Sequence, residues 1–522
     1  MTTAPPPSRA EIPGGPTSIA TVLDAGLAAH PEREALVGRH GRFTWSELDA
    51  TADRAADVLV ALGVGSGTRV AMALPNDVDI VVAFLACMRI GAIWLGVGVS
   101  LAPPEKSFLL EDSGATVMLA TPRVGAEMRA ATPAGVEIVV VDPGGPDDEW
   151  RDRLADTDAD RRPNAIDPHG PAAISYTSGT TGRPKGAIHS QHNLLVPGAV
   201  ARARGQYRPE DRVGVVLPLT LVNLLSLGPL LAWQVGAPCV AIDRIDAPGL
   251  AGWIRDEGVS AIATVPTIMH DLLTHPEVQA DDLASLRVPG VGGADCPETF
   301  RVLYRERFGR EVTVGYGLTE APTAVTMTDP DAAPVPGTAG RALPHVRLTI
   351  VGEDGAEVAP GEIGEICVGP AVDGPWAGVY TPMLGYWNRP DETASALRDG
   401  VLHTGDLGTI DRDGELRVVD RRNDLIIRGG ANVYPAEVER VLHLDPRVAA
   451  CAVVGRPDER LGERVVAFVQ VAPGENLPPD ELGALCAANL ARYKVPEEIR
   501  FVDGFDRTAM GKIVKASLRV AS

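Results

Sequence analysis

A glycine- and hydroxyl-rich stretch, residues 175–186, carries the side chains best suited to bind a polyanion. Hydroxyls and backbone N–H groups beside glycine can donate to phosphate oxygens, and Lys185 adds a positive charge. The apolar residues 172–176 before it predict a short buried strand that delivers this loop. Pro184 separates glycine from lysine, so the loop is not of the Walker A type. The residues expected to bind phosphate are Thr177, Ser178, Gly179, Thr180, Thr181, Gly182 and Lys185.

Four further motifs follow the loop along the chain. They are Tyr316-Gly317-Leu318-Thr319-Glu320, Thr404-Gly405-Asp406, residues 421–424 with 428–439, and Arg507-Thr508-Ala509-Met510-Gly511-Lys512. In order and spacing, the five motifs resemble those of the adenylate-forming superfamily, which includes acyl-CoA and aryl-CoA synthetases, peptide-synthetase adenylation domains and luciferases. The resemblance extends from about residue 43 to residue 512.

The resemblance implies a nucleotide site that binds ATP and Mg²⁺. Tyr316 would lie against adenine, Thr319 would contact the α-phosphate, and Glu320 would hold Mg²⁺, a hard cation that prefers oxygen ligands. Lys512 would be the catalytic lysine of adenylate formation, acting together with Thr319 and Glu320. The remaining ATP-binding residues implied are Gly293, Ala294, Asp295, Gly317, Leu318, Asp406 for the ribose, and Arg421.

The resemblance also implies two half-reactions separated by a large rotation of a small C-terminal domain. Asn423 lies at the hinge position, where the family usually has Asp or Lys. Arg428, Gly429 and Gly430 would then approach the acceptor thiol of CoA. Asp295 and Asp506 are further departures from the family pattern, and the first of them leaves the adenine contacts open.

An apolar pocket is expected for the carboxylic acid. Its expected residues are Leu221, Val222, Asn223, Val265, Val291 and Gly292. Residues 213–242 contain no carboxylate that could pair with an α-ammonium group, and a buried unpaired charge is costly. An amino-acid substrate is therefore disfavoured, while fatty, alicyclic and aromatic acids stay open. Residues 96–100 depart from the family pattern without a functional explanation.

Alternating helix and strand patterns predict an α/β protein with parallel sheets. We expect a flexible tail at 1–18, a large N-terminal domain at 19–422 with a β-rich subdomain at about 346–420, and a small mobile α+β C-terminal domain at 424–522. Ser46 is the expected N-cap of a long helix that ends near Leu62. Residues 123–170 are expected to form a surface segment. The uncharged stretch 213–242 is interrupted by proline and glycine, which favours a buried core over a membrane span.

Composition restricts the partners. A net charge of −21 argues against nucleic acid and anionic membrane surfaces, which reward basic patches. The six cysteines are far apart in the sequence, which indicates reduced thiols in a cytoplasmic protein and no spacing typical of zinc ligands.

The function expected is therefore an ATP-dependent carboxylic acid–CoA ligase. The alternatives are a stand-alone amide ligase that passes the adenylate to an amine, loading of a carrier protein, and a non-catalytic nucleotide-binding module. The expected partners are a small carboxylic acid and CoA, with a homodimer as an open question.

Overall fold

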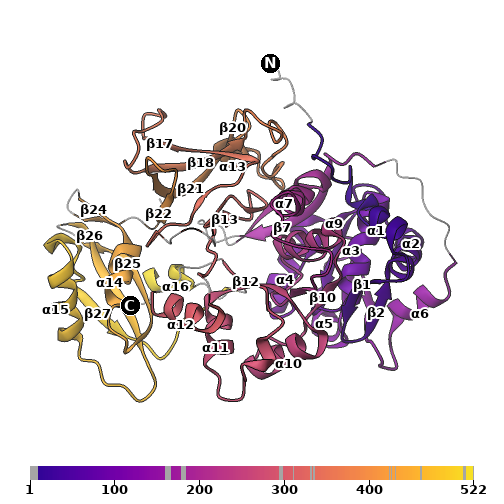
Figure 1. Cartoon of the computed structure of the whole chain (residues 1–522), viewed down its shortest axis with the longest axis horizontal. Coiled ribbons are helices and arrows are strands. Elements are labelled where there is room, and N and C mark those ends of the chain that lie inside the picture. The colour runs from indigo at the N-terminus through magenta and orange to yellow at the C-terminus, as the bar shows by residue number, and fades with distance from the viewer. Residues whose placement is uncertain are drawn as a thin grey trace.

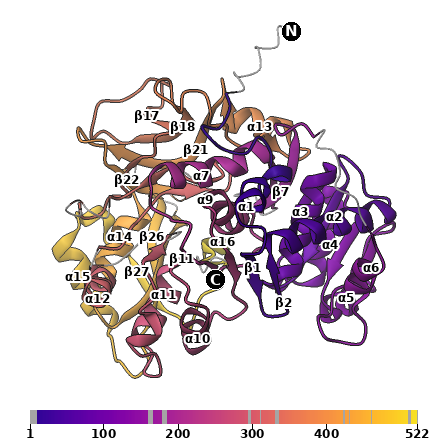
Figure 2. The same ribbon diagram turned by 45° about the vertical axis from the view of Figure 1, so that its right-hand side comes forward.

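The computed structural model describes residues 10–158, 166–177, 184–292, 298–309, 311–329, 332, 335–421, 424, 426–428, 431–458, 461–508 and 513–520. Two α/β sheets form one side of the molecule, a β-rich part lies above them, and the C-terminal part lies at the opposite side (Figure 1). Figure 2 shows the same three-part arrangement after a 45° turn.

The first α/β sheet has seven strands. Their order is β19 (Gly385–Tyr386), β8 (Lys185–Ser190), β7 (Pro171–Thr177), β4 (Ile93–Gly96), β3 (Arg69–Ala73), β5 (Val117–Ala120) and β6 (Glu137–Val140). The pairs from β7 to β6 are parallel, while β8 pairs with β7 and β19 in antiparallel fashion. The expectation of a surface segment at 123–170 is wrong for β6, because Val139 is fully buried at the edge of this sheet.

The second sheet has six strands, of which only β2 is antiparallel to its neighbour. Their order is β12 (Val288–Val291), β11 (Ala261–Thr264), β9 (Val213–Val215), β10 (Cys239–Ala241), β1 (Glu34–Gly38) and β2 (Gly41–Thr44). Asn76, just after β3, joins the two sheets at their carboxyl ends. Its amide nitrogen lies within hydrogen-bonding distance of the carbonyl oxygens of 215, 216, 217 and 242, at 2.9–3.4 Å, and its oxygen accepts from the N–H of Leu219 at 2.7 Å.

Helices cover and separate the sheets. The helix α3 (Val78–Ile90) is buried along almost its whole length in a core shared by both sheets, and Asp77 accepts from its first N–H. The prediction that Ser46 is the N-cap is wrong. The N-cap of α2 (Trp45–Ala61) is Thr44, whose hydroxyl and Glu47 form a capping box. The other helices here are α1 (Asp24–Ala29), α4 (Pro103–Ser113), α5 (Pro122–Met128), α6 (Glu149–Ala155), α7 (Gln191–Ala203), α10 (Ala247–Glu257), α11 (Pro266–Thr274) and α12 (Glu298–Phe308).

The uncharged stretch 213–242 forms strand, helix and strand in the core, as expected. Between β9 and β10 it contains α8 (Val222–Leu225), a π-helical turn at Ser226–Leu230 and α9 (Leu231–Val235). None of the helices in the described ranges has the length and apolar character that a membrane crossing requires.

The β-rich part is built on a five-stranded antiparallel sheet. Its strands are β17 (Val346–Val351), β18 (Gly364–Pro370), β21 (Val401–Ile410), β20 (Leu397–Arg398) and β22 (Leu416–Arg421), with α13 (Pro390–Ala396) beside it. Four two-residue strands connect this part to the α/β sheets: β13 (Gly317–Leu318), β14 (Thr323–Ala324), β15 (Thr326–Met327) and β16 (Arg341–Ala342).

The C-terminal part has its own sheet and its own hydrophobic core. The sheet contains β24 (Ala431–Val433), β23 (Ile426–Arg428), β26 (Gly462–Val471), β25 (Val448–Asp458) and β27 (Glu498–Phe501), and the helices are α14 (Pro435–Leu442), α15 (Pro479–Asn489) and α16 (Lys515–Val520). The predicted fold class, parallel α/β sheets with a β-rich subdomain and an α+β C-terminal domain, is confirmed. The domain boundaries and the mobility of the C-terminal domain stay predictions.

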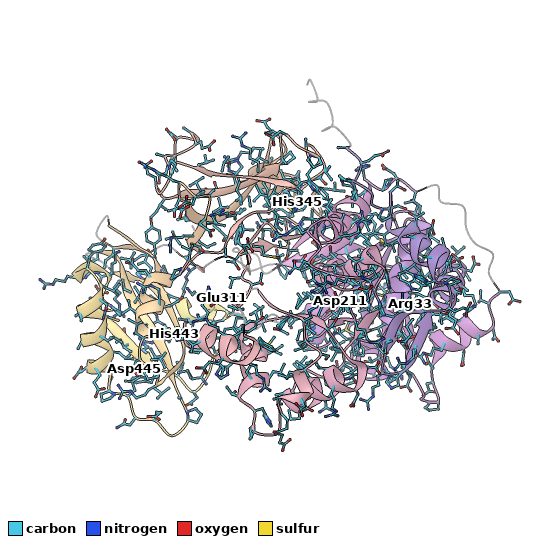
Figure 3. All side chains as sticks on the ribbon, in the orientation of Figure 1. Arg33, Asp211, Glu311, His345, His443 and Asp445 are labelled. Carbon is cyan, nitrogen blue, oxygen red and sulfur yellow. The ribbon has the colours of Figure 1, made fainter. Side chains whose placement is uncertain are left out.

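His189 and His345 are buried, and burial is the cause of their lowered pKa values. His189 on β8 is fully buried, and neither ring nitrogen has a hydrogen-bond partner in the described part of the chain. His345, labelled in the upper part of Figure 3, packs against Trp376 and Tyr380 at centroid distances of 6.4 and 5.7 Å. Burial lowers the pKa of each imidazole to about 3, so both are neutral in the folded protein at pH 7.

Candidate active site

A cavity of about 2620 Å³ lies where the three parts of the molecule meet. Gly96, Leu217, Thr264 and Gly292 line it, and these residues end or follow strands β4, β9, β11 and β12. Ligands of open α/β sheets bind at the carboxyl ends of the strands. The cavity therefore occupies the position at which this topology places a binding site.

The phosphate loop is held by two antiparallel strands. Thr177 ends β7 and lies opposite Lys185, which begins β8, and both residues line the cavity. The five loop residues expected to contact phosphate between them, Ser178, Gly179, Thr180, Thr181 and Gly182, lie outside the described residues. The Lys185 ammonium group lies 5.4 Å from the ring centroid of Tyr386, which places a positive charge at the base of the loop.

Glu320 lies beside this loop. The hydroxyl of Tyr386 donates to Oε1 of Glu320 at 2.9 Å, and the Thr177 hydroxyl approaches the same oxygen at 3.5 Å. Burial and the nearby Glu320 carboxylate raise the pKa of Tyr386, so this phenol stays a hydrogen-bond donor. Thr319 and Glu320 both line the cavity, which leaves a carboxylate facing the space beside the phosphate loop.

The expected adenine and ribose residues are in direct contact. Tyr316, which precedes β13, donates its hydroxyl to Oδ2 of Asp406 at 2.6 Å. Gly317, Leu318, Tyr316 and Asp406 all line the cavity. Arg421 lies opposite Asp406 in the pairing of β21 with β22, so the backbone brings these two positions together.

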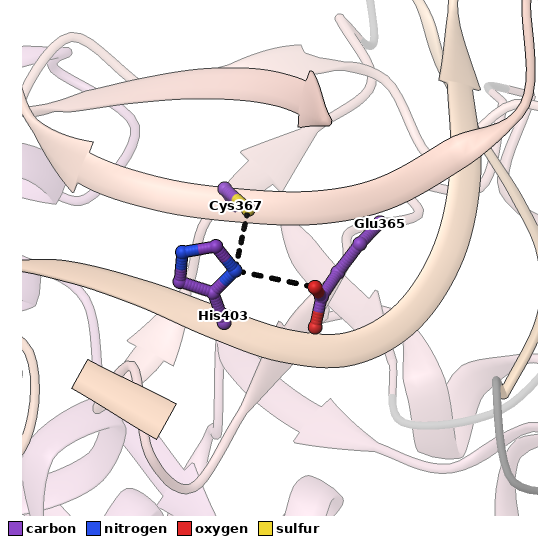
Figure 4. A group of neighbouring side chains, drawn as sticks. All are labelled: Glu365, Cys367 and His403. Atoms are coloured by element: carbon purple, nitrogen blue, oxygen red, sulfur yellow. Dashed lines mark hydrogen bonds and ion pairs between the residues drawn. The ribbon is translucent and has the colours of Figure 1, made fainter. Parts of the chain in front are cut away.

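A bulge in β21 presents Asp406. On β18, Glu365 and Cys367 are two residues apart, whereas their partners on β21, Leu407 and His403, are four apart. Residues 404–406 of β21 therefore face the single residue 366 of β18 and leave the β18–β21 ladder, and Gly405 adopts φ 74°, which favours glycine. Oε1 of Glu365 accepts from the N–H of Gly405 at 3.0 Å, while Oε2 lies 3.2 Å from Nδ1 of His403 (Figure 4).

Most of the residues expected to form the acid pocket lie just before or in α8 and at the end of β12. Leu221, Val222, Asn223, Val291 and Gly292 line the cavity as expected, but the structure does not bring Val265 to it. Val265 is instead buried in the core shared by the two sheets, and its neighbour Thr264 faces the cavity. Because successive residues of an extended chain point in opposite directions, the predicted position is off by one residue.

Two features of this pocket bear on its ligand. Oδ1 of Asn223 is buried and has no hydrogen-bond partner among the described residues. The Cα of Gly96 packs directly against the backbone before α8, because a Cβ built there would lie 1.8 Å from the carbonyl oxygen of Thr220. This close approach gives the unusual glycine at position 96 a structural reason.

The C-terminal part closes the cavity on one side. Tyr434, Lys494, Arg507, Thr508 and Val514 line it. The N–H of Val514 donates to the carbonyl of Asp506 at 2.9 Å, which holds together the two ends of the segment that contains Lys512. Lys512 itself lies outside the described residues, as do Gly293, Ala294, Asp295, Asn423, Gly429 and Gly430.

The position of Arg428 differs from the one expected for a residue near the acceptor thiol. It is not among the residues that line the cavity, and its guanidinium group forms an ion pair with Glu497. In this arrangement of the C-terminal part, the arginine supports the sheet rather than the cavity.

Sequence reasoning missed Tyr386 and Glu365. Tyr386 belongs to a two-residue edge strand, and no pattern around it distinguishes it from a core aromatic. Glu365 acts through a cross-strand register that is not visible in one sequence. Tyr386 donates a hydrogen bond to the expected site residue Glu320, and Glu365 accepts one from the backbone of Gly405, next to the expected residue Asp406.

Comparison with known proteins agrees with this geometry. The AMP-binding enzyme family matches residues 23–387, and the AMP-binding enzyme C-terminal domain matches residues 437–512. The chain is 37% identical to a feruloyl-CoA synthase of Amycolatopsis sp. over 95% of this chain and 98% of that protein. It is 35% identical to an indoleacetate–CoA ligase of Aromatoleum aromaticum, over 95% and 96%, and 34% identical to a long-chain-fatty-acid–CoA ligase of Mycobacterium tuberculosis, over 92% and 93%.

A solved structure is similar to this chain along nearly its whole length. The O-succinylbenzoate coenzyme A synthetase of Bacillus subtilis, in complex with ATP and a magnesium ion, superimposes with a TM-score of 0.82 at 30% identity. The match covers 95% of this chain and 99% of that one.

Proposed function

The chain belongs to the AMP-binding enzyme family and is an acid–CoA ligase that works through an acyl-adenylate, and from this premise we propose that its acid is a ring-containing carboxylic acid with a polar group on or near the ring. The observation that carries the proposal is the side chain of Asn223, which lies beside Leu221 and Val222 in the cavity lining and whose amide oxygen is buried without a hydrogen-bond partner among the described residues. A buried polar atom without a partner is costly, and a substrate group that pairs with it removes that cost.

In the first half-reaction, a carboxylate oxygen attacks the α-phosphorus of ATP and pyrophosphate leaves. Lys185 and the phosphate loop would bind the leaving phosphates, while Asp406 would accept from the ribose hydroxyls and Tyr316 would lie against adenine. Lys512 and Thr319 would stabilise the negative charge that develops at the α-phosphate.

A carboxylate next to a phosphate site fits a hard divalent cation. Glu320 would hold Mg²⁺, which when bound neutralises charge on the triphosphate. Tyr386 donates to one oxygen of Glu320 and so fixes the orientation of the carboxylate toward the cavity.

In the second half-reaction, the thiol of CoA attacks the acyl carbon and AMP leaves. The similarity to CoA ligases along nearly the whole chain supports CoA over an amine as acceptor. Rotation about Asn423 would exchange Lys512 for residues 428–430. Because Arg428 pairs with Glu497 away from the cavity, this step requires the C-terminal part to move.

Two of the relatives named above are ligases of polar ring acids by their names, and the third is a ligase of long-chain fatty acids. Feruloyl and indoleacetyl groups both carry a hydrogen-bonding group on an aromatic ring, whereas a long-chain fatty acid carries none. Asn223 is the residue that would distinguish these classes.

The test compares ring acids in pairs, in which one member carries a hydrogen-bonding group that the other lacks. The enzyme is incubated with ATP, Mg²⁺ and CoA, and AMP and product masses are recorded for indole-3-acetate against 1-naphthaleneacetate, ferulate against cinnamate, and a fatty acid. We expect kcat/KM about tenfold higher for the polar member of at least one ring pair, and Asn223→Leu should remove that preference. Equal rates within every pair, or a preference for the fatty acid, would contradict the proposed substrate class.

The same assay distinguishes CoA from an amine or a carrier protein as the acyl acceptor. Acyl-CoA formed only with CoA present identifies the thiol acceptor, whereas AMP release that depends on an amine or a carrier protein would overturn it. A homodimer and a cytoplasmic location stay predictions, of which light scattering of the purified protein tests the first.

A further inference from the structure

Three potential metal ligands meet beside the bulge of β21 that presents Asp406. Cys367 of β18 lies directly opposite His403 of β21, and Glu365 is two residues from Cys367 on the same face (Figure 4). Nδ1 of His403 lies 3.4 Å from Sγ of Cys367 and 3.2 Å from Oε2 of Glu365. All three ligand atoms lie within 4.8 Å of one another.

These spacings are close to those of a tetrahedral zinc site. Zinc–sulfur bonds of about 2.3 Å and zinc–nitrogen or zinc–oxygen bonds of about 2.0–2.2 Å place neighbouring ligand atoms roughly 3.3–3.6 Å apart. The two measured contacts of His403 Nδ1 are at this separation or slightly below it. Small side-chain rotations would therefore suffice to surround an ion.

The charges also balance. On binding, the Cys367 thiol would release its proton to solvent and become a thiolate, His403 would coordinate as neutral imidazole, and Glu365 would contribute a second negative charge. A divalent cation neutralises these two charges in a place where an uncompensated charge would be costly. The Cys367 residue is 1% exposed, while the His403 and Glu365 side chains are 14% and 15% exposed, so an ion can reach the cluster from one side.

We propose that Glu365, Cys367 and His403 bind one zinc ion, or a cation of the same thiophilic class, beside the bulge of β21 that presents Asp406. Thiolate and imidazole ligands select zinc over magnesium, so this site is distinct from the magnesium expected at Glu320. His403 is 36 residues from Cys367 in the sequence, and the cluster contains no second cysteine, which explains why cysteine spacing predicts no zinc site.

Hydrogen bonds connect the cluster to the bulge of β21. Oε1 of Glu365 holds the N–H of Gly405 while Oε2 faces His403, and the Thr404 hydroxyl donates to the carbonyl of Ile366 at 2.8 Å. An ion that joins β18 to β21 at His403 would hold the base of the bulge that presents Asp406. Its binding should consequently stabilise the folded protein.

The test measures zinc binding directly, without ATP or substrate. Full-length protein is stripped with a chelator and titrated with zinc chloride against a colorimetric chelator. We expect one site per chain that Cys367→Ala weakens roughly tenfold or more. Cys239→Ala, a change at another buried cysteine in β10, serves as the matched control and should bind as the unmodified protein does.

Cobalt identifies the ligand. Cobalt(II) added to the stripped protein should produce a thiolate charge-transfer absorption that Cys367→Ala loses and Cys239→Ala keeps, and zinc should raise Tm only where Cys367 is present. Circular dichroism establishes that each variant is folded, and Cys367→Ser replaces Cys367→Ala if the latter is not. Equal zinc binding in the Cys367 variant and the unmodified protein, or no binding by the folded unmodified protein, would overturn the proposal. Neither outcome depends on which acid the enzyme uses.

Discussion

The two ends of the cavity differ in how completely their polar groups are paired. The nucleotide end, formed by Glu320, Tyr386, Tyr316 and Asp406, is joined by hydrogen bonds of 2.6 and 2.9 Å between side chains from separate segments. The end proposed to bind the acid, here called the acid end, is lined mainly by apolar residues such as Leu221, Val222 and Val291, and the amide oxygen of Asn223 there has no partner among the described residues.

This difference indicates which end determines which property. A preorganised set of donors and acceptors suits a ligand that is the same in every turnover, whereas an apolar wall with one polar group selects by shape and by a single hydrogen bond. Changes at the nucleotide end should affect rate and ATP binding, and changes at the acid end should affect the choice of acid.

The largest effect is expected from Lys512→Ala, which removes the cation assigned to the α-phosphate. Adenylate formation should slow by roughly 10²–10³-fold, as for loss of one group that stabilises transition-state charge. Thioester formation from a synthetic acyl-adenylate should be nearly unchanged, because Lys512 is not assigned to that step. Single-turnover kinetics of each half-reaction check this, and equal losses in both would contradict the assignment.

Asp406→Ala should raise KM for ATP by about 10–100-fold, because hydrogen bonds to a charged group contribute about 1.5–3 kcal/mol each. The KM for the acid should change little. Asp413→Ala, in an exposed turn between β21 and β22, is the matched control and should leave both constants unchanged. A comparable rise in KM for the acid would show that the two ends are not separable.

Gly96→Ala should damage the acid end. The added Cβ would meet the Thr220 carbonyl, and overpacking of this kind costs about 1–3 kcal/mol of unfolding free energy. We expect a lower Tm and a KM for the acid that rises more than the KM for ATP. Gly65→Ala is the control, since a Cβ at that position meets no atom within 4 Å. An unchanged acid KM would show that the α8 wall adjusts freely.

Tyr386→Phe should have a smaller effect, because it removes one hydrogen bond to Glu320 and leaves the carboxylate in place. The expected loss in kcat/KM is about two- to tenfold, with a higher Mg²⁺ concentration needed for half-maximal rate. Tyr380→Phe removes a buried hydroxyl that has no partner among the described residues, so its Mg²⁺ dependence should not change. The same shift in both variants would argue against a role of Tyr386 in orienting Glu320.

A pH effect on stability is expected from the buried His189 and His345. Their folded-state pKa of about 3 lies below the unfolded value near 6.5, so below pH 6.5 the unfolded chain binds more protons and stability falls as pH falls. Each would contribute about 2 kcal/mol of lost stability at pH 5.

Urea unfolding from pH 7.5 to pH 5 measures this dependence. His345→Phe should flatten it, whereas His270→Phe, at an exposed position, should not. An unchanged slope in the His345 variant would show that this imidazole takes up its proton while folded.

The sequence predicted the nucleotide end better than the acid end, and the reason is physical. Phosphate, ribose and Mg²⁺ need particular residue types at short spacing, so Thr177, Lys185, Glu320 and Asp406 stand out in one sequence, and the structure brings them to one cavity. Apolar residues that line a pocket look the same as apolar residues of the core. Val265, which lies in the core while Thr264 lines the cavity, shows this ambiguity.

Interactions between distant segments were not predictable from local patterns. The pairing of Cys367 with His403 depends on the register of β18 and β21 around the bulge in β21. The ion pair of Arg428 with Glu497 likewise depends on how the C-terminal sheet is assembled. In each case the residue types are ordinary, and only tertiary placement gives them a role.

The contact between Gly96 and Thr220 bears on efforts to redesign this enzyme for other acids. Because strand β4 fixes the backbone that leads into α8, the wall of the acid pocket offers a rigid scaffold for mutant libraries. Leu221, Asn223 and Leu227, which all line the cavity, are the positions to vary on it, whereas insertions or deletions near 220 would be poorly tolerated. A library restricted to those three positions, with Gly96 kept, should give a larger share of folded and active variants than one that alters the length of the loop.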